Sequence, residues 1–384
     1  MQSSGPKGFL VHTANIGLRE QGDDFTVIAS EVPAVCSAVF TKSRFAGPSV
    51  LLSREAVADR SARGVVVLAA NANVATGEEG LKNASEVRGA IARLLEAGDD
   101  QILIASTGVI GRQYPMEQVR SGLEQLRWPF GGADFDAAAH AIMTTDTKAK
   151  IVRRRCGEAT LVGIAKGVGM MEPDMATMLT FFCTDAEFAP DQLDRTFRTV
   201  MDKTFNALSV DTDTSTSDTA AIFANGLAGP VDPAEFEAVL AEVALDLVRQ
   251  IAKDGEGATK LIEVQVTGAR DDDQAKRVGK AVVNSPLVKT AVHGADPNWG
   301  RVVMAIGKCS DDLDILPERV RVDFGEAELY PREPGAEGLE ALRDYLSGDE
   351  VVIRIDLGIS TGAFTVYGCD LSEGYIRINA DYTS

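Results

Sequence analysis

One hydroxyl group with the surroundings of a nucleophile stands in the stretch KGVGMMEPDMATMLTFF, residues 166–182. Thr177 lies where an irregular segment, with two glycines, a proline and a lysine, meets the apolar run ATMLTFF, which is typical of a buried strand. Such an irregular approach can hold the Ala176–Thr177 peptide in a strained geometry within reach of the threonine hydroxyl. The pattern leaves two interpretations open, an ordinary core strand and a self-cleaving N-terminal nucleophile, and residue types alone favour the first.

A second candidate for chemistry is ASTGVIG, residues 105–111, directly after the apolar run QILI. Small residues at the end of a strand can present backbone N–H groups and a hydroxyl to an oxyanion, where such donors are most valuable in acyl transfer. The same residues also form tight turns, and the motif by itself favours that interpretation. NANVATG, residues 71–77, and HGADPNWGR, residues 293–301, allow the same two interpretations.

Sites for metals and nucleotides find little support in the sequence. DTDTSTSDT, residues 211–219, begins like a calcium loop, but Thr216 and Ile222 stand where an EF-hand needs glycine and glutamate. GVGMME, residues 167–172, lacks the third glycine of a dinucleotide-binding motif and the GK[ST] ending of a Walker A loop. The chain has only three histidines, and its five cysteines form no C-x-x-C pair, so we expect no metal site and no disulfide. Any nucleophile would therefore need a base other than histidine.

Composition excludes several kinds of partner. The 38 basic residues face 57 acidic ones, giving a net charge of −19 without a basic stripe, which argues against nucleic acid. The start MQSSGPKGFLVHTANIG lacks the basic and apolar regions of a signal peptide, and no apolar stretch is long enough to span a bilayer. We therefore expect a cytoplasmic protein without nucleic-acid or membrane partners.

The elements that must position these residues are strands and helices mixed along one chain. Apolar, β-rich runs bounded by turn residues occupy 23–43, 64–77 and 100–111, and a helical period separates two of them at 84–98. The clearest helix covers 232–255, with an aspartate at the N-cap and a proline in the first turn. Strand patterns return toward the C-terminus. The architecture that fits is mixed α/β or α+β, with layered sheets covered by helices.

The segment AKGVGMMEPDMATML, residues 165–179, resembles the self-cleavage motif of the glutamate N-acetyltransferase (ornithine acetyltransferase) family, usually A-K-G-S-G-M-x-x-P-N-M-A-T-M-L. Six further motifs have counterparts in family order: STGVIG, MTTDT, DTDTSTSDT, DGEGATKLIEV, DPNWGR and INADYTS. The resemblance runs the length of the chain. The combined motifs are most similar to the family branch associated with clavulanic acid biosynthesis. It makes self-cleavage the favoured interpretation of Thr177.

The resemblance implies a fold, an assembly and a set of residues. The family fold is a layered αββα sandwich resembling N-terminal-nucleophile hydrolases, which we expect roughly over 1–280, with a smaller domain roughly over 281–384. Cleavage between Ala176 and Thr177 would give an α chain of residues 1–176 and a β chain of residues 177–384, assembled as α2β2. Thr107 and Gly108 match the oxyanion hole. The positions that match the substrate-binding residues are Thr147, Lys166, Thr177, Glu256, Asn379 and Ser384.

The implied reaction moves an acetyl group from N2-acetyl-L-ornithine to L-glutamate by ping-pong kinetics through an acetyl ester of Thr177. The free amine left by cleavage has a reference pKa of about 7.7–8.0 and can serve as the base, without a cofactor; acetyl-CoA enters only if the enzyme is bifunctional. An alternative is an amidohydrolase or aminopeptidase with water as acceptor, and a third is an unprocessed binding protein. The departures from the family pattern are Val168, Asp174, Thr212 and Ser217.

Overall fold

The computed structural model describes residues 5–172, 178–332 and 335–381. Its main body is built on one sheet with the strand order β4-β3-β2-β8-β7-β6-β5, in which β1 pairs alongside β2. The bounds of these strands are β1 Phe9–Ala14, β2 Phe25–Phe40, β3 Ser61–Leu68, β4 Ile102–Ser106, β5 Lys150–Cys156, β6 Ala159–Lys166, β7 Leu179–Glu187 and β8 Thr219–Pro230.

The long strand β2 belongs to both halves of this sheet. Its first part pairs with β3, its last part pairs with β8, and the β2–β3 register shifts between Ala29 and Ala34. The two halves face each other, because side chains of β3 and β4, such as Val65 and Leu103, share one buried cluster with Ile164 and Phe181 of β6 and β7. Helix α4, Phe135–Ala141, adds apolar side chains to that cluster.

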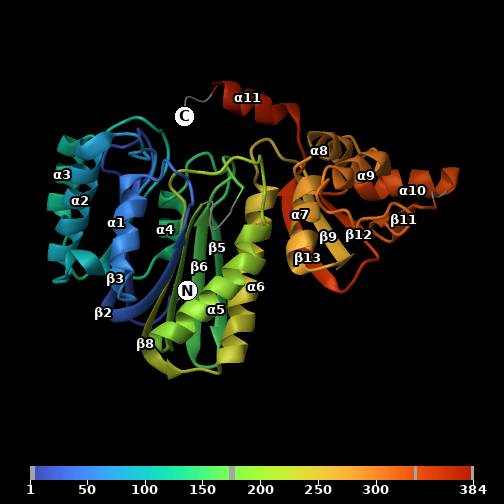
Figure 1. The fold of residues 1–384 in the computed structure, drawn as a ribbon. Helices are drawn as coiled ribbons and strands as arrows, with labels where there is room; N and C mark the ends of the chain where they lie inside the picture. The colour runs from blue at the N-terminus through green and yellow to red at the C-terminus, as the bar shows by residue number, and fades with distance from the viewer. Residues whose placement is uncertain (1–4, 173–177, 333–334, 382–384) are drawn as a thin grey trace.

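Helices cover the outer face of each half-sheet. On one side, α1 (Pro48–Ala56), α2 (Gly77–Leu94) and α3 (Met116–Gln125) contribute to the cluster that packs on β2, β3 and β4. On the other side, α5 (Pro190–Lys203) and α6 (Pro233–Lys253) pack on the half formed by β5 to β8 (Figure 1). The layers thus run helix, sheet, sheet, helix, and the predicted αββα sandwich is confirmed.

Helix α6 shows how the sequence pattern becomes packing. The Asp232 side chain accepts a hydrogen bond from Glu235 N at 2.8 Å, which caps the helix, and Pro233 occupies its first position. Phe236, Leu240 and further residues of the same face are fully buried against the sheet. Burial of each such side chain contributes about 1.5–3 kcal/mol. The packing fixes the C-terminal end of α6, which leads into the candidate site.

A second sheet follows with the strand order β11-β10-β12-β9-β13. Its strands are β9 Leu261–Ala269, β10 Arg321–Phe324, β11 Ala327–Tyr330, β12 Glu350–Asp356 and β13 Gly362–Cys369. The helices beside it are α7 Asp272–Val283, α8 Pro286–His293, α9 Trp299–Gly307 and α10 Ala336–Leu346. Its main apolar cluster includes Ile262, Val278 and Ile353.

The second sheet begins before the domain limit expected from the sequence. The expected limit near residue 281 falls inside α7, whereas the second sheet already begins with β9 at Leu261. The reason is strand pairing: β9 lies parallel to β12, with Val264 opposite Ile353, and antiparallel to β13. Residues from Leu261 onward thus belong to the second sheet and its helices.

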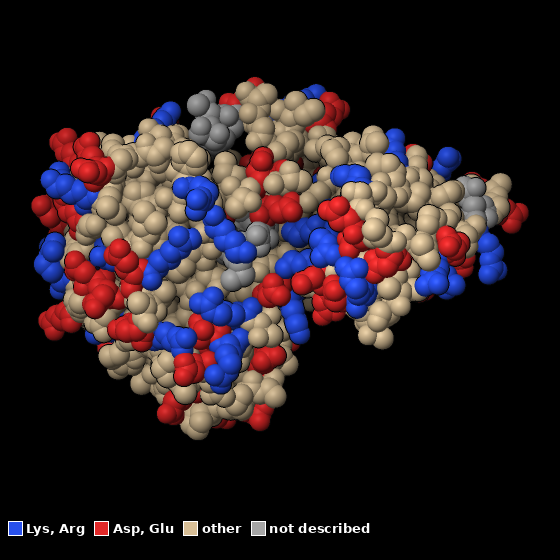
Figure 2. All heavy atoms as spheres, in the orientation of Figure 1, with Lys and Arg blue, Asp and Glu red and all other residues tan. Residues whose placement is uncertain are grey.

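The C-terminal helix α11, Glu373–Asp381, leaves the second body and extends over the open end of the sandwich (Figure 1). Acidic and basic side chains are interspersed over the face shown in Figure 2. Among the helices of the described ranges, none has both the length and the apolar composition needed to cross a bilayer.

Candidate functional site

Thr107 and Gly108 lie at the end of β4, where the chain leaves the buried sheet. The Thr107 N–H donates to Leu68 O at 3.0 Å, and the Val109 N–H donates to Ala70 O at 3.3 Å. Between these two bonds, the Gly108 N–H has no acceptor within the described part of the chain. A backbone donor left free beside a threonine hydroxyl is the arrangement that can receive a developing oxyanion.

Only glycine fits at position 108. Its φ is +125°, and a Cβ atom built there would stand 2.2 Å from the carbonyl carbon of Ala70. Ala70 itself has a φ of +72°, which is uncommon for a residue with a side chain. Close contact between the two loops therefore holds the Gly108 N–H in place, at the cost of local backbone strain.

Lys166 ends β6 and reaches Thr107 from the opposite half of the sheet. Its Nζ donates to Thr107 Oγ1 at 2.9 Å. Because that oxygen accepts the bond, the Thr107 hydroxyl hydrogen is free to point elsewhere, toward an oxyanion. Burial lowers the pKa of the Lys166 ammonium, against the attraction of the Asp146 and Asp218 carboxyls.

Glu256 lies just after α6, and side chains from two other segments hold its carboxylate. Oε1 accepts from Thr145 Oγ1 at 2.9 Å, and Oε2 accepts from Asn379 Nδ2 of α11 at 2.8 Å. Gly169 faces the same group, since a Cβ atom there would be 2.5 Å from Oε2. A carboxylate fixed in this way can bind an ammonium group.

A cavity of about 120 Å³ joins these groups. The predicted residues that line it are Thr107, Gly108, Lys166, Glu256 and Asn379. Thr145, Met170, Ser215 and Thr216, for which no site role was predicted, also line it. Strands β4 and β6 and the segments after α6 and around residue 215 thus converge on one site at the end of the sandwich.

Beneath this cavity, a buried lysine joins two carboxylates. Lys150 is 1% exposed, and its Nζ lies 2.7 Å from Asp146 Oδ1 and 2.6 Å from Asp254 Oδ2. Asp146 Oδ1 also accepts from Gly167 N at 2.7 Å, next to Lys166. Burial alone would raise the pKa of Asp146, but the nearby lysine charges keep that pKa below its usual value. The network ties the Lys166 end of β6 to the end of α6.

Thr147 belongs to this network and does not line the cavity. Its N–H donates to Asp254 Oδ2 at 3.1 Å, and its hydroxyl donates to Asp254 Oδ1. The substrate-binding role implied by the resemblance is therefore not visible in the cavity wall, which Thr144 and Thr145 form instead. Spacing along MTTDT does not distinguish these threonines, because the turn decides which of them faces the site.

Asp211 joins the segment before β7 to the C-terminal helix. Its carboxylate accepts from Met170 N at 2.7 Å and from Met171 N at 2.6 Å, and it lies 3.4 Å from the Tyr375 hydroxyl of α11. Gly257 packs against α11 as well, since a Cβ atom there would be 2.3 Å from Tyr375 N. These contacts position Asn379 beside Glu256.

Several predicted residues lie outside the described ranges, namely Asp174, Ala176, Thr177 and Ser384. Of the other departures from the family pattern, Val168 is buried and its carbonyl oxygen accepts from Glu256 N at 2.9 Å. Thr212 has a φ of +72°, and Ser217 lines the cavity. The described residues contain no cluster of three or more His, Cys, Asp or Glu side chains suited to a metal ion.

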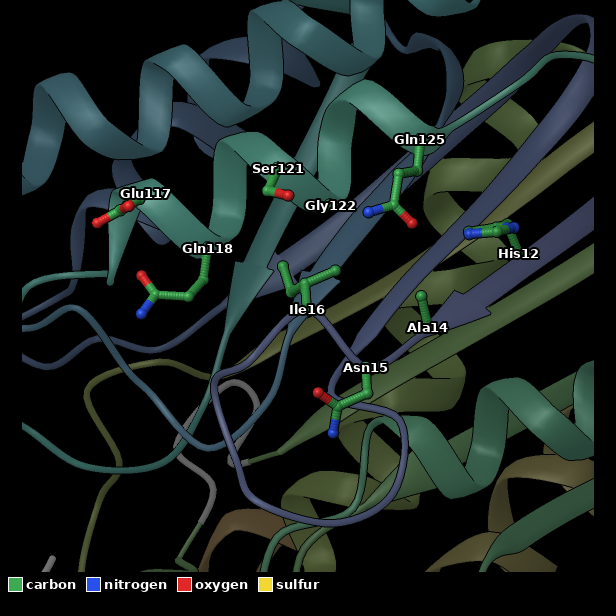
Figure 3. A pocket seen from close by; sticks show the side chains of 9 residues that line it. All are labelled: His12, Ala14, Asn15, Ile16, Glu117, Gln118, Ser121, Gly122 and Gln125. Carbon is green, nitrogen blue, oxygen red and sulfur yellow. The ribbon is translucent and has the colours of Figure 1, made fainter.

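A larger pocket of about 560 Å³ lies elsewhere, between the first strand and α3 (Figure 3). Burial lowers the pKa of His12 in its wall, so the imidazole is neutral near neutral pH. His12 and Ser121 stand apart in Figure 3, and the structure has no hydrogen bond between these two described side chains. The pocket lacks the joined donors and charges that characterise the site around Thr107.

Comparison with known proteins is consistent along the whole chain. The model of the ArgJ family matches residues 10–384. The chain is 69% identical over 385 residues to glutamate N-acetyltransferase Oat2 of Streptomyces clavuligerus, an alignment that covers 99% of this chain and 98% of that protein. It is 56% identical over 389 residues to the arginine biosynthesis bifunctional protein ArgJ of Rhodococcoides fascians, covering 100% and 96%. A crystal structure of the arginine biosynthesis bifunctional protein ArgJ from Bacillus halodurans shares 42% identity at a TM-score of 0.49, covering 52% of this chain and 96% of that one.

Proposed function

Because the chain belongs to the ArgJ family, we propose that it is a glutamate N-acetyltransferase, which transfers the acetyl group of N2-acetyl-L-ornithine to L-glutamate. The observation that carries this conclusion is the 69% identity to Oat2 over nearly the full length of both proteins. The chain is an acyltransferase of arginine biosynthesis or of a clavulanic-acid-type secondary pathway. No basic surface or membrane-spanning helix is needed for such small substrates.

The first step of the proposed mechanism is self-cleavage. Thr177 Oγ1 attacks the carbonyl carbon of Ala176, the peptide C–N bond breaks, and the nitrogen takes a proton to become the Thr177 amine. Water then hydrolyses the ester and releases Ala176 as the new C-terminus. The freed amine has a reference pKa of about 7.7–8.0, so it can take the hydroxyl proton in later turnovers without a histidine.

The second step is acetyl transfer. Thr177 Oγ1 attacks the acetyl carbonyl, the Thr107 hydroxyl and the Gly108 N–H stabilise the oxyanion, and ornithine leaves with the proton from the amine. Glutamate then enters the same cavity, and its amine takes the acetyl group from the ester. Lys166 supports the oxyanion through Thr107 Oγ1, at 2.9 Å, and its ammonium has a further donor for the substrate.

Recognition of the amino acids is assigned to groups of opposite charge. Glu256, held by Thr145 and Asn379, suits the side-chain ammonium of ornithine, and Lys166 suits an α-carboxylate. Thr147 and Ser384 complete the proposed substrate-binding set. The proposed assembly is an α2β2 heterotetramer in the cytoplasm, and the cleaved chains stay associated. The ornithine reaction needs no cofactor, and assays with acetyl-CoA as the only acetyl donor test whether the chain is also bifunctional.

The decisive experiment measures intact mass and acetyl transfer on the same samples. Wild type should yield two fragments that meet at Ala176–Thr177, and Thr177→Ala should stay in one piece. A single uncut wild-type chain after prolonged incubation would favour the binding-protein alternative.

The hydrolase alternative is tested with N2-acetylornithine in the presence and absence of glutamate. We expect N-acetylglutamate to form at the rate at which ornithine is released, with little free acetate. Acetate release that is indifferent to glutamate would instead support an amidohydrolase.

A further inference from the structure

A buried carboxyl group without an assigned role lies beside the substrate cavity. Asp218 directly precedes β8 and is 2% exposed. Its backbone is fixed by both neighbouring strands, since its carbonyl oxygen accepts from Thr41 N at 3.1 Å and Thr219 N donates to Met178 O at 2.8 Å. Its Oδ2 atom has no hydrogen-bond partner in the described part of the chain. A buried carboxyl oxygen is rarely left in this state, because its desolvation is then not offset.

Asp218 lines a small chamber together with Lys166 and Thr107. The volume of the chamber is about 20 Å³, and one water needs roughly 10–15 Å³. Ser215 and Ser217 also line it and offer further polar groups. Four of these residues also line the larger cavity: Thr107, Lys166, Ser215 and Ser217. The chamber therefore adjoins the substrate site, and Asp218 lines only the chamber.

The charges of Lys166 and Asp218 shift each other's pKa values. The two side chains form no ion pair among the described residues. Burial raises the pKa of Asp218 well above its usual value, and the Ser215 side chain and the Lys166 charge oppose that rise only in part. The raised pKa favours the protonated acid, which can donate a hydrogen bond as well as accept one. Polar groups that interact across such a gap are commonly joined by a water.

We propose that Asp218 is a positioning residue: through one water in this chamber, it holds the Lys166 ammonium in the direction that reaches Thr107 Oγ1. The inference rests on the proposed function and adds a residue to it. An ammonium has three donors. One binds Thr107, the second binds the chamber water, and the third faces the substrate cavity. Without Asp218, the water loses its anchor and the ammonium turns toward the carboxylates on its other side.

A double-mutant cycle between Asp218→Ala and Thr107→Ala tests the proposal. Rates are expressed per cleaved enzyme, with the cleaved fraction taken from intact mass. Asp218→Ala alone should lower kcat on the order of 10-fold to 10²-fold, as misplaced catalytic groups do, with little change in the KM for N2-acetylornithine. In the Thr107→Ala background the same change should lower kcat little further, because Lys166 then has no hydroxyl to direct. Losses that multiply would overturn the proposal.

Asp218→Asn is the matched variant, since it keeps the shape and the neutral state of the acid. We expect its kcat to stay close to that of wild type, and this variant keeps the test informative where Asp218→Ala fails to fold. An asparagine variant as slow as the alanine variant would also overturn the proposal. The two levels of inference separate cleanly: a wild type without glutamate-dependent transfer overturns the proposed function, whereas an active wild type with multiplying losses overturns the role of Asp218 alone.

Discussion

Lys166 and Thr107 come from strands in opposite halves of the folded sheet, and a hydrogen bond of 2.9 Å joins them. The Lys166 ammonium donates, so the threonine hydroxyl keeps its own hydrogen for a third atom. The candidate oxyanion hole is therefore a product of the layered fold, since neither half-sheet carries it alone. Its two donors are the Thr107 hydroxyl, oriented by Lys166, and the Gly108 N–H, fixed by the neighbouring loop around Ala70.

Thr107→Ala should lower kcat by on the order of 10²–10³, because it removes one of the two oxyanion donors. Steady-state transfer from N2-acetylornithine to glutamate measures the effect, with rates expressed per cleaved enzyme. Thr107→Ser is the control: it retains the hydroxyl and should keep most of the activity. Wild-type rates in the alanine variant would exclude Thr107 from the oxyanion hole.

Lys166→Arg should move the alkaline limb of the kcat profile to higher pH. Burial lowers the pKa of Lys166 from its ordinary value of 10.5, so its ammonium loses the proton earlier as pH rises. Activity that needs the charged form is thus present at lower pH and lost as pH passes that lowered pKa. An arginine stays charged throughout, whatever its effect on the maximum rate.

The control for this pH profile is Lys148→Arg, since Lys148 is exposed and should leave the limb where it is. An alkaline limb at the same pH in the Lys166→Arg variant and in wild type would show that another group titrates there.

Sequence patterns were sufficient to predict local elements such as helices, and shared family motifs were sufficient to predict the fold and the function. The family, the αββα fold and the acetyltransferase function are confirmed, and helix α6 follows its cap and apolar stripe. The pairing of β9 could not be predicted, because its sequence indicates a strand without revealing that its partners are β12 and β13, far along the chain. Thr145 and Asp218 were missed for the same reason, since only tertiary contacts place them at the site. The roles of Thr177, Thr147 and the other site residues stay predictions.

Lys150→Met should lower the free energy of unfolding by about 3–5 kcal/mol, the usual effect of removing one partner from a buried ion pair. Two carboxylates, those of Asp146 and Asp254, would remain buried without their shared cation. Chemical denaturation measures the change. The exposed side chain of Lys148 supplies a matched Lys148→Met control, which should be nearly neutral. Equal stability of both variants would contradict a structural role for the Lys150 network.

Thr212→Gly should stabilise the protein by about 1–2 kcal/mol, because a β-branched residue at positive φ is strained. The φ of Thr212 is +72°. The family motif usually has glycine at this position. Thermal unfolding measures the gain as a higher Tm. Thr214→Gly in the same loop is the control: Thr214 is not among the residues with positive φ, so that change should destabilise. A lower Tm for Thr212→Gly would show that the contacts of the threonine side chain stabilise the loop by more than the backbone strain destabilises it.

The pairing of β6 with β7 would hold the two fragments of the proposed cleavage in one sheet. A cut at Ala176–Thr177 separates the chain between these two antiparallel strands, and β2 also pairs with β8 across the same division. Both fragments would thus contribute strands to a single sheet, so neither would contain the whole core of the sandwich. Before the cut, folding is unimolecular. After the cut, refolding would require two separate chains to associate. The proposed processing would therefore make unfolding irreversible, because a molecule that unfolds after the cut no longer has the covalent connection between its two parts.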